Sequence, residues 1–229
     1  MAQMNNKTKE EDNMCYVMND LEDVVRQFGR GRDNNGRYMA YDHCYHFFQK
    51  NYNTDCECTK DLMTLHLFAY LANWGMLRNS FLMCKDYKFS RPVVDYLCNV
   101  QKDIASNKSF DIMEIKKTIT GLYKFNSDGK PNTYIEGNEI KEICRVSDIL
   151  ITKILMGTLG ITPAYDTFFC KTAKDLGMIQ SFGINSYRQL EQFIEANKDV
   201  IEMLSIEMNY PHMKIVDMYF WQKAINNSN

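Results

Sequence analysis

The sequence predicts an all-α fold of about nine helices in a compact orthogonal bundle, with two packed halves as one possible arrangement. Apolar residues recur at helical spacing through most of the chain. The 229 residues include only four prolines and eleven glycines, so few positions interrupt long helices. Hydrophobic residues make up 45% of the chain and charged residues 24%, which is typical of a globular protein with a sizeable core.

The first helices are predicted from apolar spacing and from the residues that stop it. The polar residues 1–12 are expected to form a disordered tail before a single all-α domain of residues 13–229. Helices are expected at about 13–28 and from 38 to 48. A third helix, 59–79, is apolar on most of its circumference, so we expect it to be buried centrally.

The start of that third helix is assigned to Thr59, a residue type that caps helices. Ser90, followed by Pro92, opens a fourth helix. Apolar residues from Ile112 to Tyr123 indicate a fifth.

The segment "FNSDGKPNTYIEGN" is the strongest turn signal in the chain and predicts a subdomain seam at 125–137. Its "SDGKP" could close a short hairpin. Helices are expected after it at about 138–157, 166–176, 186–207 and 211–226. The "SYRQ" sequence at Ser186 fits a capping box.

Composition also restricts the compartment and the partners. The start "MAQMNNKTKEEDN" has no apolar central region, and most of the eight cysteines lie in apolar runs, so we expect reduced cysteines in a cytoplasmic protein. No segment approaches the roughly 20 apolar residues of a membrane-spanning helix, so no membrane partner is expected. A net charge of −2 gives no global electrostatic footprint for nucleic acid.

The stretch "TKILMGTLGITPAYDTFF" is the strongest candidate for a site. Gly157 and Gly160 permit a close approach or a left-handed helix end, and Pro163 fixes the linker that follows. Asp166 then falls where a new helix begins. Its carboxylate is interpreted either as an ordinary helix cap or as a catalytic group.

Residues 140–170 resemble the catalytic half of helix-hairpin-helix DNA glycosylases. The matching features are the apolar helix, Gly160, Pro163 and the carboxylate Asp166. The resemblance implies a catalytic Asp166 and action on nucleic-acid bases. The chain departs from the family in two ways: "KEICRVSD" replaces the glycine-rich hairpin, and Ser147 falls near the position of the nucleophilic lysine, where it cannot form a Schiff base.

The phrases "YLANWGMLRNSFL", "ILMGTLGITPAYDTFF" and "MKIVDMYFW" also resemble a family of uncharacterised bacterial cytosolic proteins. That resemblance implies an all-helical fold and no particular activity.

Two further groups of polar residues could face a ligand. Trp74 and Arg78 lie one helical turn apart, as an aromatic plane and a guanidinium that suit a base, a carboxylate or a phosphate. The alternative is a core tryptophan beside a surface arginine. Ser147 either caps a helix or contributes to a site. Lys153 lies in an apolar run, where burial requires a partner such as Asp166 or Asp217.

These observations give two functional hypotheses. The first is a ligand-binding, potentially enzymatic domain for nucleic acid or a small molecule, with a pocket walled by Trp74, Arg78, Lys153, Tyr165 and Asp166, and with Ser147 as a further ligand-binding residue. The second is a non-enzymatic interaction module, such as a homo-oligomer, because 15 methionines and 14 tyrosines suit adaptable surfaces.

Metal and cofactor motifs are weak. A zinc site is one interpretation of four residues, His43, His46, Cys56 and Cys58. The Cys-x-Cys pair, however, lacks the usual two-to-four-residue spacing of structural zinc sites. No phosphate-binding loop or dinucleotide fingerprint is present. We therefore expect no metal site and no cofactor.

Overall fold

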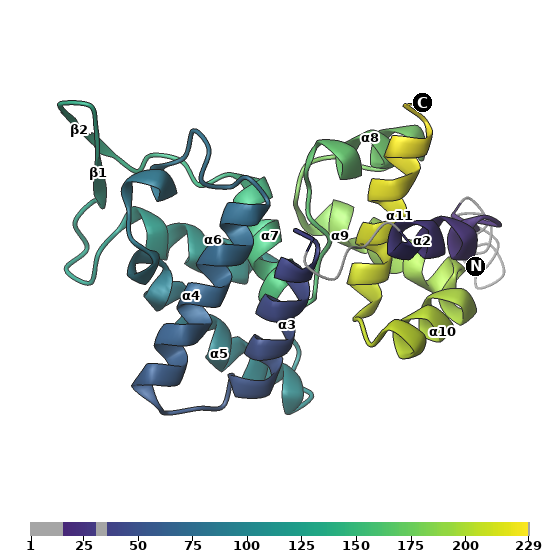
Figure 1. Cartoon of the computed structure of the whole chain (residues 1–229), viewed down its shortest axis with the longest axis horizontal. Coiled ribbons are helices and arrows are strands. Elements are labelled where there is room, and N and C mark those ends of the chain that lie inside the picture. Colours follow the sequence, from purple (N-terminus) through teal and green to yellow (C-terminus); the bar gives the residue numbers. More distant parts are fainter. Residues whose placement is uncertain (1–15, 31–35, 229) are drawn as a thin grey trace, which may run out of the picture. The chain divides into compact units, whose positions relative to one another are not determined.

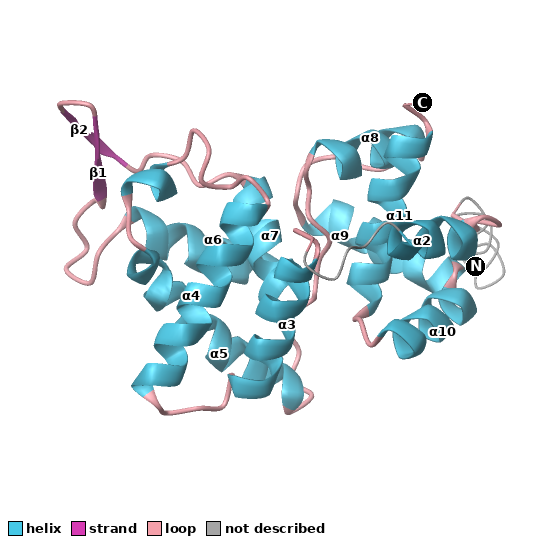
Figure 2. Ribbon diagram, in the orientation of Figure 1, coloured by secondary structure: helices cyan, strands magenta, loops and turns pink. Residues whose placement is uncertain are grey.

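The computed structural model describes residues 16–30 and 36–228, so the expected tail of residues 1–12 lies outside the described part of the chain. This part is helical apart from one two-stranded sheet, which confirms the all-α class (Figures 1 and 2). The described residues form ten α-helices, where about nine were expected. Two compact units are distinguished: unit one spans residues 1–32 and 160–229, and unit two spans residues 33–159.

Unit one is assembled around its last helix, α11. That helix packs against α2, α8 and α10, and it buries nearly every side chain from Met213 to Phe220. An all-round apolar helix needs neighbours on every side, which explains its central place in this unit. The helices of unit one are α2 (Leu21–Arg30), α8 (Thr167–Asp175), α9 (Ile184–Ala196), α10 (Lys198–Met208) and α11 (His212–Asn226).

The amino-terminal part of unit one is attached to the rest through Asn197, which lies between α9 and α10. The side-chain amide of Asn197 donates to the carbonyl of Tyr16 at 2.7 Å and accepts from the Met18 amide at 2.8 Å. Leu21 and Val25 of α2 are buried, and Arg26 forms an ion pair with Glu207 at the end of α10. Residues from both ends of the sequence therefore share one core.

Unit two is assembled around α7 in a similar way. Every residue from Leu150 to Thr158 is buried, and α7 packs against α3, α4 and α6. The elements of unit two are α3 (Met39–Asn51), α4 (Glu57–Asn73), the 3₁₀ turns η1 (Phe81–Cys84) and η2 (Tyr87–Ser90), α5 (Arg91–Ala105), α6 (Ile112–Lys124), β1 (Thr133–Glu136), β2 (Glu139–Glu142) and α7 (Asp148–Thr158).

The two glycines of the α7 region act as the sequence suggested. A Cβ on Gly157 would lie 2.5 Å from Cε1 of Tyr70, so its missing side chain allows α7 and α4 to approach closely. Gly160 has a φ of 68°, the left-handed conformation of a residue that follows a helix.

The turn-rich segment after α6 forms a hairpin within unit two. Asn126 and Gly129 form a first turn, in which the Asn126 side chain accepts from the amides of Asp128 and Lys130. Strands β1 and β2 follow in antiparallel register, with Glu136 opposite Glu139. At "SDGKP", which the sequence marked as one possible hairpin, an isolated bridge between Phe125 and Pro131 forms.

Several predicted boundaries are wrong. The expected helix at 138–157 is strand β2, a loop and then α7, because the Gly137 turn pairs residues 139–142 with β1. The helix expected at 186–207 is two helices, α9 and α10, and the cap of α9 is Gly183, with Ser186 three residues inside.

The third predicted helix also needs correction. Helix α4 begins at Glu57, two residues before Thr59, and ends at Asn73. Leu62 and Leu65 of α4 are each 43% exposed, so this helix buries one side only, and α7 takes the central place. Residues 13–15 of the helix expected at 13–28 lie outside the described part of the chain, and within that part the helix is α2, which starts at Leu21 because residues 16–20 are not helical.

Candidate functional site: a basic cleft in unit two

A cleft of unit two has a volume of about 830 Å³. Its walls come from the turn after α4, from η1, from the β1–β2 hairpin and from the loop that leads into α7. Its polar lining includes Arg78, Ser80, Lys141, Glu142, Arg145 and Ser147. The structure therefore brings two of the predicted site residues, Arg78 and Ser147, into one cleft.

The turn after α4 presents Arg78. Gly75 has a φ of 75°, its amide donates to the carbonyl of Ala72, and the Met76 amide donates to the carbonyl of Leu71. This pair of hydrogen bonds is a Schellman motif, which ends the helix at a left-handed glycine. A Cβ on Gly75 would meet nothing within 4 Å, so this glycine serves the left-handed turn and not a close approach of helices.

The opposite wall is the amino-terminal end of α7. Ser147 is its N-cap, with its hydroxyl oxygen accepting from the Leu150 amide at 3.2 Å. Asp148 in the first turn forms an ion pair with Lys116 of α6 at 2.7 Å. The negative charge of Asp148 is thus balanced, and the positive end of the helix dipole adds to the cationic character of the cleft.

The guanidinium groups of Arg78 and Arg145 carry that cationic character. Both side chains are exposed, and neither forms an ion pair with any residue that the structure describes. Lys141 differs, because its ammonium pairs within the hairpin with Glu136 at 2.6 Å and with Glu139 at 3.6 Å. Two cations from distant parts of the sequence therefore open into one space without a carboxylate partner among the described residues.

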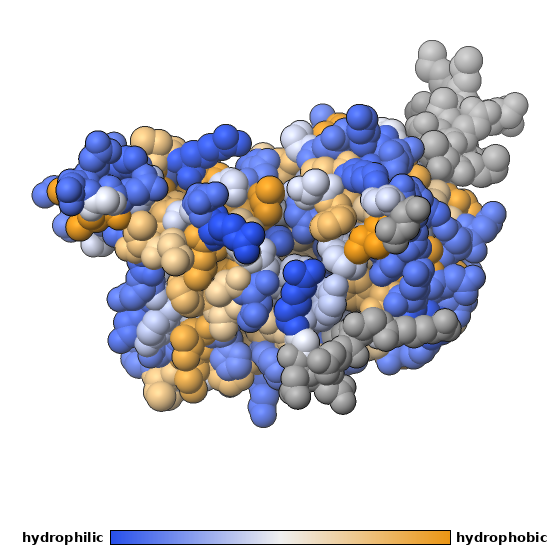
Figure 3. Space-filling model, turned by 45° about the horizontal axis from the view of Figure 1, so that its top comes forward, coloured by the Kyte–Doolittle hydropathy of each residue, from blue (hydrophilic) through white to orange (hydrophobic). Residues whose placement is uncertain are grey.

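The rest of the lining is apolar or aromatic and includes Met76, Phe81, Tyr134, Ile143 and Leu150. Phe81 packs on the buried ring of Tyr123 at 5.5 Å, and burial raises the pKa of Tyr123 to about 12, so this supporting ring stays neutral. Figure 3 shows apolar side chains among hydrophilic ones at the hairpin end of the visible face.

The hairpin is oriented by its register. Tyr134 lies opposite Lys141, and both line the cleft. The neighbouring pair, Ile135 and Ile140, points to the other face of the hairpin, where these side chains are 64% and 76% exposed. Alternation along two short strands thus gives one face to the cleft and the other to solvent.

Trp74 and Lys153 meet elsewhere in unit two. The ammonium of Lys153 lies 5.1 Å from the centre of the Trp74 ring and donates to the Trp74 carbonyl at 3.4 Å. Arg37 approaches the same ring at 5.5 Å, and Tyr38 packs edge-on against it at 5.6 Å. The indole Nε1 is buried and has no hydrogen-bond partner among the described residues.

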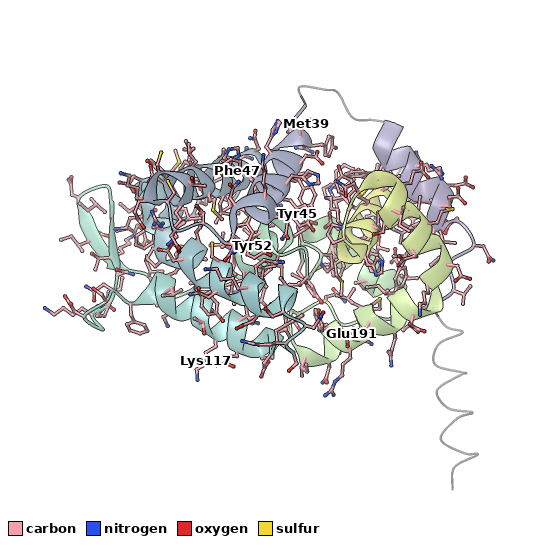
Figure 4. The ribbon with its side chains drawn as sticks, turned by 90° about the horizontal axis from the view of Figure 1, so that it is seen from below. Met39, Tyr45, Phe47, Tyr52, Lys117 and Glu191 are labelled. Carbon is pink, nitrogen blue, oxygen red and sulfur yellow. The ribbon has the colours of Figure 1, made fainter. Side chains whose placement is uncertain are left out.

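A second hollow of about 440 Å³ lies at the start of α3 and along α4, where it is lined by Arg37, Met39, His43, His66 and Asn73. Phe47 stacks on the His66 ring with centres 4.3 Å apart. Partial burial of His66, together with the nearby His43, lowers the pKa of the His66 imidazole, so this ring is neutral near pH 7. Figure 4 shows Met39, Tyr45 and Phe47 on α3, with Tyr52 directly after this helix.

Tyr165 and Asp166 belong to unit one. Asp166 is the N-cap of α8, and one carboxylate oxygen accepts from the amides of Phe168 and Phe169 at 3.1 and 3.2 Å. Tyr165 is buried, and its hydroxyl donates to the side chain of Ser186. The capping role of Asp166 is therefore present, while its convergence with Trp74 and Arg78 stays a prediction.

Asp217, named as one potential partner of Lys153, forms its own buried pair in unit one. Its carboxylate accepts from the ammonium of Lys214 at 2.8 Å and from the amide of Ala164 at 3.0 Å. This pair fixes the linker before α8 onto α11.

Other candidate chemistry finds less support. The described residues contain no group of three or more histidine, cysteine or acidic side chains arranged to hold a metal ion. The seven described cysteines are free, and Cys84 and Cys144 are exposed although most cysteines lie in apolar runs of the sequence. Among described residues, no helix is both long and apolar enough to cross a membrane.

Sequence reasoning did not select Lys141, Glu142 or Tyr134 for the site. These residues line the cleft because the β1–β2 hairpin forms. A helix was predicted at 138–157, where strand β2 is found, so the hairpin was missed. The glycine and asparagine of "EGNE" were the available signal, since such pairs are typical of two-residue hairpin turns. Compared with protein-family models, curated proteins and solved structures, the chain matches none.

Proposed function

We propose that the protein is a helical ligand-binding domain that holds an anionic ligand in the basic cleft of unit two. The observation that carries this proposal is the pair of guanidiniums, Arg78 and Arg145, which face one cleft without a carboxylate partner among the described residues. Guanidinium groups match carboxylate and phosphate oxygens with paired donors. A ligand with such a group would supply the missing opposite charge.

Further support comes from the surroundings of the arginines. The cleft volume of about 830 Å³ is within the range of small-molecule sites. The hydroxyl of Ser147 accepts from the backbone, so its proton stays available for a ligand oxygen. The apolar lining provides a second, uncharged contact area for the body of the ligand.

The test is ligand-dependent thermal stabilisation with inorganic phosphate, pyrophosphate and citrate as probes. A ligand that binds only the folded state raises the melting temperature with its concentration. We expect Arg78→Gln and Arg145→Gln each to weaken binding about ten-fold or more, since a hydrogen bond to a charged group contributes roughly 1.5–3 kcal/mol.

Lys117→Gln is the matched control. Lys117 is an exposed residue of α6 in the same unit, does not line the cleft, and points away from the helices in Figure 4. The substitution removes one positive charge, as the arginine variants do. Equal losses in all three variants would contradict the proposal, because they would indicate a general charge effect.

Action on nucleic-acid bases is the second candidate, with Asp166 as the catalytic group. It is supported by the position of Asp166 at the start of a helix that follows an apolar helix, Gly160 and Pro163. Its test is incubation with duplexes that carry damaged bases, followed by detection of abasic sites. Activity that survives Asp166→Asn at the wild-type level would remove this role.

A further inference from the structure

Resting on the proposed anion site, we infer that the ligand of the basic cleft is a nucleoside phosphate, either free or as a unit of a single strand. The lining combines two kinds of chemistry that such a ligand requires: cations for the phosphate and an aromatic ring for the base. The cations are Arg78 and Arg145, and the ring is that of Tyr134.

The cations suit a phosphate group. Two guanidiniums offer more donors than a single carboxylate can accept, whereas a phosphate monoester has three oxygens and up to two negative charges. The Ser147 hydroxyl adds a donor in the same cleft. Asp148 does not oppose the anion strongly, because Lys116 balances its charge at 2.7 Å.

The aromatic component is Tyr134. Its ring lines the cleft and makes no ring contact with the aromatic residues that the structure describes. Lys141, opposite in the hairpin, is neutralised by Glu136 and Glu139, so the surroundings of the ring are not strongly charged. A half-exposed ring in such a place is a platform on which a base can stack.

Glu142 does not face the phosphate. Tyr134 and Lys141 form one register pair, and Glu142 is the next residue along β2, so its side chain shares the face of Ile140. The phosphate and the base of the ligand therefore each meet a group of matching chemistry in the cleft.

The test compares adenosine 5′-monophosphate, ribose 5-phosphate and inorganic phosphate by calorimetry on the full chain. We expect the nucleotide to bind about ten-fold more tightly than ribose 5-phosphate, which is within the range that base stacking contributes. Tyr134→Leu should remove this difference in affinity and leave the affinity for ribose 5-phosphate unchanged. Tyr134→Phe, which keeps an aromatic ring, should retain the difference.

A single-stranded ten-nucleotide probe distinguishes the two sources. Tighter binding of this probe than of the mononucleotide, with the same dependence on Tyr134, identifies a strand, and equal or weaker binding identifies a free nucleotide.

Equal affinity for nucleotide, ribose 5-phosphate and inorganic phosphate, with both arginines still required, would overturn the nucleoside inference and leave the anion site intact. If neither Arg78→Gln nor Arg145→Gln changes the affinity for any of the phosphate probes, the proposed anion site is wrong.

Discussion

At the scale of the single residue, the packing of unit two leaves no room for a side chain at Gly157. The Tyr70 ring that faces it is fully buried and packs edge-on against Tyr41. Any side chain at position 157 must displace that ring. Gly121 in α6 is the opposite case, because a Cβ there would meet nothing within 4 Å.

We predict opposite effects for alanine at these two positions. Gly157→Ala should lower the free energy of unfolding by about 1–3 kcal/mol, as other additions to a full core do. Gly121→Ala should raise it by roughly 0.5–1 kcal/mol, because alanine restricts the unfolded chain and favours a helix. Urea unfolding followed by circular dichroism measures both. A stabilising Gly157→Ala would show that Tyr70 moves freely.

At the scale of the element, apolar spacing located most helices, because burial of one helix face requires that spacing. The predicted helix boundaries are wrong where a local turn competes with the apolar spacing. Residues 139–142 carry alternating charges that suit a helix surface, but the Gly137 turn pairs them with β1. The cap at Asp166 was predictable, since its short side chain precedes the helix directly.

Helix α11 contains the buried Lys214–Asp217 pair, whose partners are 3% and 8% exposed. We predict that Lys214→Met lowers the free energy of unfolding by about 3–5 kcal/mol, because it leaves the Asp217 charge buried without its ammonium partner. The control is Lys223→Met in the same helix, where the pair with Asp20 is partly exposed.

The control variant should change the free energy by about 1 kcal/mol or less. Thermal and urea unfolding of both variants provide the comparison. Equal losses in the free energy of unfolding would contradict the prediction that the buried ion pair contributes more than the partly exposed one.

At the scale of the whole molecule, the site depends on contacts that the sequence does not display. Helical spacing placed Trp74 and Arg78 on one helix, but α4 ends at Asn73, and the turn separates the two residues. Arg78 then joins Ser147 in the cleft, while Trp74 joins Lys153. Which partners meet is decided by the packing of α7 against α3 and α4, and that packing depends on residues throughout unit two.

Unit two is continuous in sequence and has its own core, so we predict that residues 33–159 fold when expressed alone. The fragment should give a helical circular dichroism spectrum, unfold cooperatively and retain the phosphate affinity of the full chain. An unfolded fragment would mean that unit two depends on unit one for its stability. A folded fragment without affinity would place the anion site elsewhere.

The discontinuity of unit one affects how the protein is made. Helix α2 is translated before unit two, but its partner α11 is translated after it. Until α11 is made, the apolar face of α2, including Leu21 and Val25, lacks this partner. Synthesis from the amino-terminal side therefore lets unit two fold while unit one is still incomplete, and in that interval the apolar face of α2 is exposed to chaperones.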